Sequence, residues 1–198
     1  MITFKNLSKD IPYVLFKEKY ERAVSANQQN VEAICISSYS KSLKEVNARF
    51  VNLKFVDEKD FIFFSNYLSP KSKQFESHDQ ISAVLFWPTI NIQIRMKSFI
   101  MKTSNNFSDK YFFNRNEEKN ALAISSMQSY PINSYSEVKK NYDKSFKNDD
   151  LKKRPEYWGG YSFTPYYFEF WEGHKSRINI REVYEKVNHS WKHTFLQP

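Results

Sequence analysis

Residues 47–66 read NARFVNLKFVDEKDFIFFSN and contain two runs of β-branched and aromatic residues on either side of the polar turn DEKD. Such residues favour β-strands, and a short polar turn between two such runs is typical of a hairpin. We therefore expect one strand over 47–56 and a second over 60–66. Similar runs, several of them alternating with period two, are VEAICISSYS (31–40), ISAVLFW (81–87), INIQIRMKSFIM (90–101), YYFEFWEG (166–173), SRINIREVYEKV (176–187) and SWKHTF (190–195). The sequence predicts an antiparallel sheet that closes into a barrel.

Four segments have helical patterns instead. They are Pro12–Asn27, residues 69–78, residues 108–126 and residues 135–147. Asp10 precedes the first as a candidate cap, and the second has Ser69 as a candidate cap with Pro70 at its first position. Helices packed outside a mainly β core predict the α+β class, with a single domain over residues 1–198.

Composition excludes several classes of protein. The chain has 30 Lys and Arg against 22 Asp and Glu, a formal net charge of +8. This charge suits an anionic partner, but the excess of Lys over Arg and the many Asn residues are also typical of a compositional bias, so the sequence does not favour nucleic acid. No apolar run approaches the ~20 residues of a membrane helix, so no membrane partner is expected. Cys35 has no partner for a disulfide and the N-terminus lacks a secretory signal, which predicts a cytoplasmic protein.

Familiar catalytic and ligand-binding motifs are absent. The chain has only three glycines, which exclude a GxGxxG motif and a P-loop, so side chains must hold any bound phosphate. There is no GxSxG, HExxH or CxxC motif and no isolated carboxylate pair. His189 and His193 lack a third ligand, so we expect exposed polar residues there and no metal.

Two clusters of cationic residues are candidates for a phosphate site. Arg49 and Lys54 lie at opposite ends of the strand predicted over 47–56. Tyr111, Arg115 and Lys119 recur every fourth residue, so one helical face offers a phenol, a guanidinium and an ammonium group. Taken alone, each pattern also fits a solvent-exposed face.

A third cluster lies in the C-terminal part of the chain. A glycine pair and an aromatic strand in WGGYSFTPYYFEFWEG (158–173) precede Arg177 and Arg181. Trp171 can stack beside a planar ring, although core packing also explains most of these aromatic residues.

Together and in this order, these segments resemble the pyridoxamine 5′-phosphate oxidase family. The similar motifs are RFVNLK (49–54), FFSN (63–66), LSPKSKQ (68–74), FW followed by Gln93, KYFFNR (110–115), MQS (127–129), WGGY (158–161), EFW (169–171) and RxxxR (177–181). The resemblance extends from Asp10 to Pro198. It implies an FMN-binding split β-barrel that forms a homodimer with FMN at the subunit interface. It also implies an FMN-dependent oxidase that converts pyridoxine or pyridoxamine 5′-phosphate to pyridoxal 5′-phosphate, with O₂ as the electron acceptor.

The resemblance further implies which residues contact FMN. Arg49 and Lys71 would neutralise its phosphate, and Gln93 would contact the flavin ring. Gln128 and Ser129 would reach over from the partner subunit. The full implied set is Arg49, Lys54, Phe64, Ser65, Lys71, Gln93, Gln128, Ser129, Trp171 and Arg181.

For the phosphorylated substrate, the implied residues are Lys54, Tyr111, Arg115, Lys119, Arg177 and Asn179. The first three would surround the phosphate, and Arg177 would lie above the pyridine ring. Arg177 and Asn179 occupy the family's catalytic positions. Lys119 replaces a serine of the family and can still bind phosphate as a point charge.

Two further departures from the family pattern concern affinity and turnover. Pro70 replaces an arginine next to Lys71, which predicts weaker FMN binding. Asn179 replaces a histidine, so a titratable group becomes a neutral amide. Two alternatives therefore stay open: a flavin-dependent oxidase of the same fold with another substrate, and a non-catalytic module that binds flavin or nucleic acid.

Overall fold

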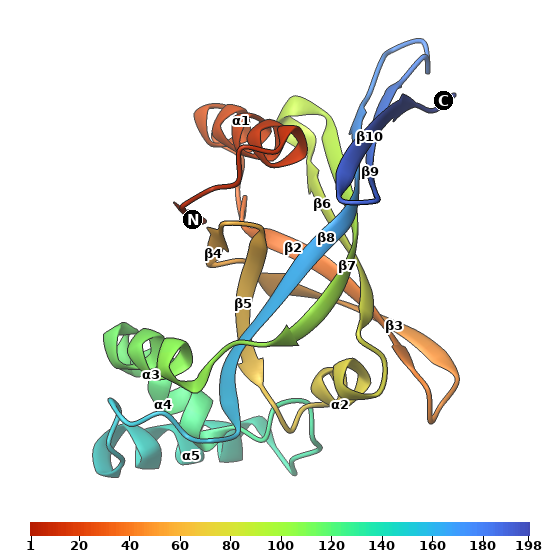
Figure 1. Cartoon of the computed structure of the whole chain (residues 1–198). Helices are drawn as coiled ribbons and strands as arrows, with labels where there is room; N and C mark the ends of the chain where they lie inside the picture. Colours follow the sequence, from red (N-terminus) through yellow and green to blue (C-terminus); the bar gives the residue numbers. More distant parts are fainter.

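Strand β8 (Trp158–Glu172) is the longest strand and pairs with three other strands. In the computed structural model, which describes residues 1–198, β5 pairs with the first part of one edge of β8 and β9 with the last part of that edge, while β7 pairs along the opposite edge. Figure 1 shows β8 crossing the molecule from the end that carries α3, α4 and α5 to the β9–β10 hairpin. One strand thus connects both ends of the fold.

The other strands are β1 (Thr3–Lys5), β2 (Ala33–Ser40), β3 (Glu45–Asn52), β4 (Phe55–Asp57), β5 (Asp60–Asn66), β6 (Gln80–Trp87), β7 (Ile92–Lys102), β9 (Ile180–Val187) and β10 (Ser190–Phe195). The helices are α1 (Ile11–Ser25), α2 (Pro70–Ser77), the short 3₁₀ helix η1 (Pro88–Ile90), α3 (Asn105–Asn114), α4 (Glu117–Ser125) and α5 (Tyr135–Asn148). The strand order is β1-β4-β5-β8-β7-β6-β2-β3, and every pairing is antiparallel except that of β1 with β4. The predicted α+β class with a mainly antiparallel sheet is confirmed.

The single strand predicted over residues 47–56 is wrong, because the chain changes sheet neighbours within it. β3 pairs with β2, whereas β4 pairs with β5. Between them, the fully buried Leu53 donates its backbone N–H to Glu32 O (2.9 Å) and Lys54 donates its N–H to Ile62 O (2.8 Å). The break therefore links β3, at one end of the strand order, to β4, which lies next to the other end. A run of β-forming residues does not reveal this change.

The helix predicted over residues 108–126 is also two elements. Arg115 ends α3 in an extended conformation (ψ 152°), and the Asn116 side chain then caps α4 by accepting the backbone N–H of Lys119 (3.1 Å). The fully buried Asn120 donates its amide N–H to Phe112 O (2.9 Å) and so fastens α4 to α3. An Asn followed by two Glu residues is a helix-start signal that the four-residue recurrence concealed.

Helix α1 fills one end of the barrel with aromatic side chains. Tyr13, Phe16 and Tyr20 are buried, and the Phe16 ring meets the Phe61 ring edge-on at 4.9 Å. Asp10 precedes the helix but its side chain makes no capping bond; its carboxylate accepts the Trp191 indole N–H at 3.1 Å instead. None of the helices is both long and apolar enough to cross a membrane.

Strand β8 begins eight residues earlier than the strand expected over 166–173, at the glycine pair. A Cβ on Gly160 would lie 2.5 Å from Thr103 Oγ1, and a Cβ on Gly159 would overlap the Tyr67 hydroxyl. The Gly160 N–H donates to Ser108 Oγ on α3 (3.1 Å). Two adjacent glycines therefore allow Tyr67, Thr103 and Ser108 of α3 to lie directly against the backbone of β8.

We predict that Gly160→Ala lowers the free energy of unfolding by about 1–3 kcal/mol, because the β-branched Thr103 side chain cannot move aside easily. Gly173→Ala is the comparison variant, since its added methyl group would meet the exposed Asn91 side chain and the outer edge of the partly exposed Trp171 ring (2.7 Å to Cη2), both of which can turn toward solvent. Urea unfolding of both variants measures the difference. Equal stabilities for the two would show that the close approach at Gly160 is not tight.

Candidate active site

A cavity of about 310 Å³ lies between β3, β5, the start of β8 and helices α3 and α4. Eight residues that the sequence singled out line it: Lys54, Phe64, Ser65, Lys71, Tyr111, Arg115, Lys119 and Gln128. Four of these are cationic, and none of the lining residues is an Asp or Glu. A concave surface with several cations and no carboxylate is suited to an anionic ligand.

One wall of this cavity is a stack of aromatic rings. The Phe64 and Tyr111 rings lie parallel at 3.7 Å, and Phe64 and Trp158 lie nearly parallel at 5.2 Å. The Arg115 guanidinium lies 4.9 Å from the Trp158 ring centre. This arrangement holds a guanidinium against a flat aromatic surface at the edge of the cavity.

The cationic residues Arg49 and Lys71 lie together without a carboxylate partner. Lys71 is 8% exposed and donates to Ser65 Oγ and Ser69 Oγ, both at 3.2 Å. Burial, together with the charge of Arg49, lowers the pKa of Lys71 to about 8. Arg49 donates to Ser38 Oγ (2.6 Å) and to Gln74 (2.9 Å). Only neutral groups solvate these two cations.

The sequence predicted Arg49 at the end of a strand, and this is wrong. It occupies the middle of β3, opposite Ile36 of β2, while Lys54 lies in the break before β4. Burial lowers the pKa of Lys54, Glu32 opposes this effect, and the neighbouring charges of Lys119 and Arg115 add to it. The Lys54 amine therefore lies within the electrostatic field of Lys119 and Arg115.

Tyr111, Arg115 and Lys119 do not share one helical face, because α3 ends before α4 begins. The cavity nevertheless collects all three. Arg115 donates to Lys119 O (2.8 Å) and to Asn120 Oδ1 (3.1 Å), which fixes its guanidinium at the break. Burial lowers the pKa of Arg115 and raises the pKa of Tyr111, so the phenol stays a neutral hydrogen-bond donor near pH 7.

Three other predicted residues form a row at the opposite end of β8. Gln93 on β7 pairs with Trp171 on β8, and Trp171 pairs with Arg181 on β9. Trp158 and Trp171 are 13 positions apart on β8, about 40 Å along an extended strand. The cavity and this row therefore cannot contact the same small molecule within one chain.

The row also contains charged residues that the sequence analysis missed. Glu169 is almost fully buried and accepts from Arg181 (2.9 Å to Nε) and from Arg95 Nη1 (2.8 Å). Side chains alternate along β8, so Glu169 and Trp171 lie on the same face of the strand. Treating EFW (169–171) as core residues does not reveal this.

Arg177 and Asn179 lie outside the cavity, in the exposed loop between β8 and β9. Arg177 has a left-handed backbone (φ 65°), and the Asn179 side-chain oxygen accepts the backbone N–H of His174 (2.9 Å). The amide of Asn179 thus stabilises the loop that carries Arg177.

Gln128, expected to reach over from a partner subunit, lies against residues of its own chain. Its side-chain oxygen accepts from Ser65 Oγ (3.1 Å) and from the Asn66 N–H (3.3 Å) of the same chain. Ser129 is exposed and lies outside the cavity, beside the loop before α5. The chain contains no cluster of three His, Cys, Asp or Glu side chains that could bind a metal.

Comparison with known proteins identifies the family. Residues 158–198 match a family model described as the pyridoxine 5′-phosphate oxidase C-terminal dimerisation region. The chain is 31% identical over 191 residues to the pyridoxine/pyridoxamine 5′-phosphate oxidase of Leptospira interrogans, covering 94% of this chain and 88% of that protein. It is 34% identical over 188 residues to the Haemophilus influenzae protein of the same name, with coverages of 94% and 89%. This chain belongs to the pyridoxine/pyridoxamine 5′-phosphate oxidase family.

Solved structures support the fold assignment. PhzG of Burkholderia lata, crystallised with tetrahydrophenazine-1-carboxylic acid, superposes with a TM-score of 0.89 at 23% identity, covering 94% of this chain and 92% of that one. A pyridoxamine 5′-phosphate oxidase-related, FMN-binding protein of Nostoc punctiforme gives a TM-score of 0.75 at 11% identity, with coverages of 92% and 97%. The predicted split barrel is confirmed, as is membership of an oxidoreductase family. The dimerisation region supports a homodimer.

We predict that Lys71→Met makes the ligand-free protein more stable at pH 7 by about 1–3 kcal/mol, because it removes a buried charge that has no acidic partner. Lys71 in the unfolded chain keeps its proton to about pH 10, so wild-type stability rises between pH 8 and 10 and the advantage of the variant shrinks there. Thermal unfolding at pH 7 and 9.5 measures this. Lys73→Met, exposed on the same helix, is the control; the same gain in both variants would refute the prediction.

Proposed function

We propose that this protein binds FMN and oxidises pyridoxine or pyridoxamine 5′-phosphate to pyridoxal 5′-phosphate, with O₂ as acceptor. The observation that carries the proposal is the cavity with Lys54, Lys71, Arg115 and Lys119 and no carboxylate among its lining residues. Two phosphorylated molecules, a flavin and a substrate, are the anions that the family assignment suggests for it. Its relatives in Leptospira and Haemophilus are named for the same substrates.

The residues present fit a flavin phosphate. Arg49 and Lys71 offer charged donors that now contact only hydroxyl, amide and carbonyl oxygens. Ser65 adds a hydroxyl that accepts a hydrogen bond from Lys71, and the Gln128 side-chain oxygen accepts a hydrogen bond from this hydroxyl. Pro70 supplies no donor where the family has an arginine, so the phosphate would be held by fewer charges.

The spacing along β8 supports a shared site in a homodimer. In this proposal one chain contributes the cavity with Lys71 and Gln128, and its partner contributes the row of Gln93, Trp171 and Arg181 together with the loop of Arg177. Such a division explains why the predicted flavin contacts occupy two ends of the strand. It assigns Gln128 to the chain that holds the phosphate, which revises the expectation from the sequence.

When bound, FMN supplies the hydride acceptor for the reaction. The chain's own residues bind and orient the substrate. Lys54, Tyr111 and Arg115 would hold its phosphate, and this remote binding energy would place the ring for reaction. Tyr111, kept neutral by its raised pKa, would donate a hydrogen bond to a phosphate oxygen. The partner's loop would set Arg177 against the pyridine ring.

Asn179 cannot exchange a proton as a histidine would, and its oxygen already accepts a backbone N–H. We therefore propose that it supports the loop and that turnover of the usual substrates is slow. This departure from the family pattern also favours the second candidate, a flavin-dependent oxidase of the same fold acting on another ring system.

The proposal predicts one FMN per subunit in a dimer and peroxide release with pyridoxine or pyridoxamine 5′-phosphate. Quenching of FMN fluorescence measures binding, light scattering measures mass, and a peroxide assay measures turnover.

Lys71→Met should weaken FMN binding whereas Lys73→Met should not. Asn179→His should raise the rate, since acid–base assistance contributes about 10²–10⁴.

Two outcomes separate the alternatives. A protein that fills with FMN but releases no peroxide, with or without Asn179→His, would point to another substrate or to a non-catalytic flavin protein. A monomer that fails to quench FMN would contradict the flavin assignment itself.

We predict that Arg115→Ala weakens binding of pyridoxal 5′-phosphate more than Lys119→Ala does. Arg115 is held on Trp158 and by two hydrogen bonds, so its guanidinium is already ordered for a two-oxygen grip, whereas Lys119 is exposed. Loss of hydrogen bonds to a charged group costs about 1.5–3 kcal/mol, roughly 10- to 100-fold in affinity. Absorbance titration compares the two variants. Equal losses would mean that the arginine is not the anchor.

A further inference from the structure

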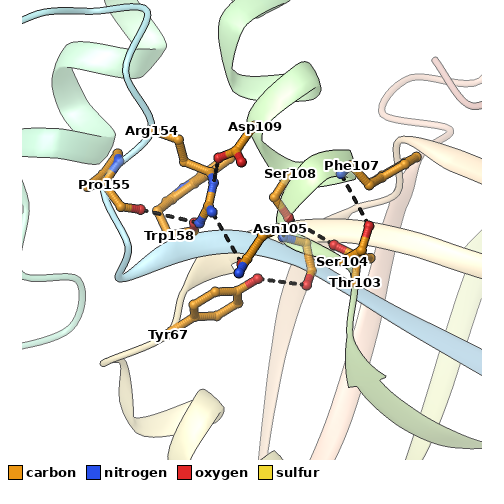
Figure 2. Close-up of polar contacts among 11 residues, drawn as sticks. Tyr67, Thr103, Ser104, Asn105, Phe107, Ser108, Asp109, Arg154, Pro155 and Trp158 are labelled. Atoms are coloured by element: carbon orange, nitrogen blue, oxygen red, sulfur yellow. Dashed lines mark hydrogen bonds and ion pairs between the residues drawn. The ribbon is translucent and has the colours of Figure 1, made fainter.

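The side chain of Arg154 is buried although the residue lies in the loop between α5 and β8. Only 7% of its surface is exposed, whereas its ion-pair partner Asp109 is 57% exposed. Figure 2 shows the guanidinium directed between helix α3 and the first residue of β8. An arginine buried in a loop requires specific acceptors, and these acceptors come from both elements.

The guanidinium of Arg154 contacts three residues of α3 and β8 at once, and its Nη1 also lies 3.5 Å from Pro155 O. Its Nε donates to Asp109 Oδ1 (2.6 Å), its Nη1 to Trp158 O (2.6 Å) and its Nη2 to Asn105 Oδ1 (3.3 Å). Asn105 and Asp109 lie one turn apart on α3, and Trp158 starts β8. A planar fork of donors suits this arrangement, and a lysine amine cannot reproduce it.

Both elements that Arg154 joins carry groups of the cavity. Trp158 is the ring against which the Arg115 guanidinium lies, and its ring also lies parallel to that of Tyr111 (8°). Tyr111 follows Asp109 by two residues on α3. The hydrogen bonds of Arg154 thus fix the relative position of Trp158 and of the helix that presents Tyr111 and Arg115.

We infer that Arg154 is a positioning residue for the substrate-phosphate group of the cavity, acting through Trp158 and α3 on Arg115 and Tyr111. This inference rests on the proposed function, because it takes Arg115 and Tyr111 as phosphate ligands. Arg154 itself lines no part of the cavity.

The packing of α3 on β8 does not depend on Arg154 alone. Ser108 Oγ accepts the Gly160 N–H (3.1 Å), Thr103 Oγ1 lies 2.9 Å from Ser108 Oγ, and the Tyr67 hydroxyl donates to Gly160 O (3.1 Å), as Figure 2 also shows. Loss of Arg154 therefore loosens the first turns of α3 while the fold stays intact. The ion pair with Asp109 contributes little by itself, because the Asp109 side chain is 57% exposed.

The test compares Arg154→Lys with Arg22→Lys, the same change at an exposed position on α1. Dissociation constants for pyridoxal 5′-phosphate and for FMN are measured, with thermal unfolding as a check on folding. We expect Arg154→Lys to weaken the binding of pyridoxal 5′-phosphate roughly tenfold, because small displacements of binding groups change affinity by this factor or more. FMN affinity should stay within about twofold of wild type, because Arg49 and Lys71, which would hold its phosphate, share no hydrogen-bond partner with Arg154.

A second measurement distinguishes positioning from general loosening. In an Arg115→Ala background, Arg154→Lys should have little further effect on pyridoxal 5′-phosphate, since residues that act through one another are non-additive. The inference would be overturned if the effects of the two substitutions on pyridoxal 5′-phosphate binding were fully additive, or if Arg154→Lys left that affinity unchanged. It would also be overturned if Arg154→Lys weakened binding of both ligands equally and lowered the melting temperature. Wild-type protein that binds FMN but not pyridoxal 5′-phosphate would instead contradict the proposed substrate, and the inference would fall with it.

Discussion

Strand β8 has two different neighbours on one edge, and most of the molecule's organisation follows from this. At its start it accommodates β5 and the close packing of α3, which requires the two glycines. At its end it holds β9 and the row of Gln93, Trp171 and Arg181. Because one strand separates these two groups by about 40 Å, a single chain does not bring both to the same small molecule. A homodimer, which the C-terminal dimerisation region supports, can bring the cavity of one chain to the row of another.

Unbalanced charge is the second constraint. The ordinary rule is that buried cations are paired, yet Lys71 has only hydroxyl oxygens as partners, and its pKa falls to about 8. Arg49 likewise contacts only neutral acceptors. Such an arrangement costs stability in the ligand-free chain and is typical of a site that is organised before its anion arrives. In the proposed function, the phosphate of FMN supplies the missing negative charge.

The sequence predicted most elements because their periodicity is local. It failed where a long-range contact decides the structure. The break at Leu53 depends on a change of sheet partner, and the break at Arg115 depends on a cap and on the buried Asn120. The early start of β8 depends on α3 lying against the glycine pair. None of these contacts produces a periodic pattern in the sequence.

The candidate site shows the same division. Resemblance to the family named eight residues that the structure gathers in one cavity, although the strand-end and single-helix arguments for Arg49 and Lys119 were wrong. Residues that support the predicted contacts, such as Glu169 beside Arg181, were missed because their partners lie on other strands.

The departures from the family pattern lie at the edges of the site and weaken it unequally. Pro70 removes a charge beside Lys71 but begins α2 without cost, because its ring fits the first helical position. In the proposed function, Lys119 keeps a cation near the substrate phosphate. Asn179 changes more, because its amide oxygen is engaged by the backbone of the loop that holds Arg177 in a left-handed conformation. A residue at this place can therefore contribute by fixing the loop without changing its charge. In the proposed function, this chain then contributes binding geometry to the flavin reaction.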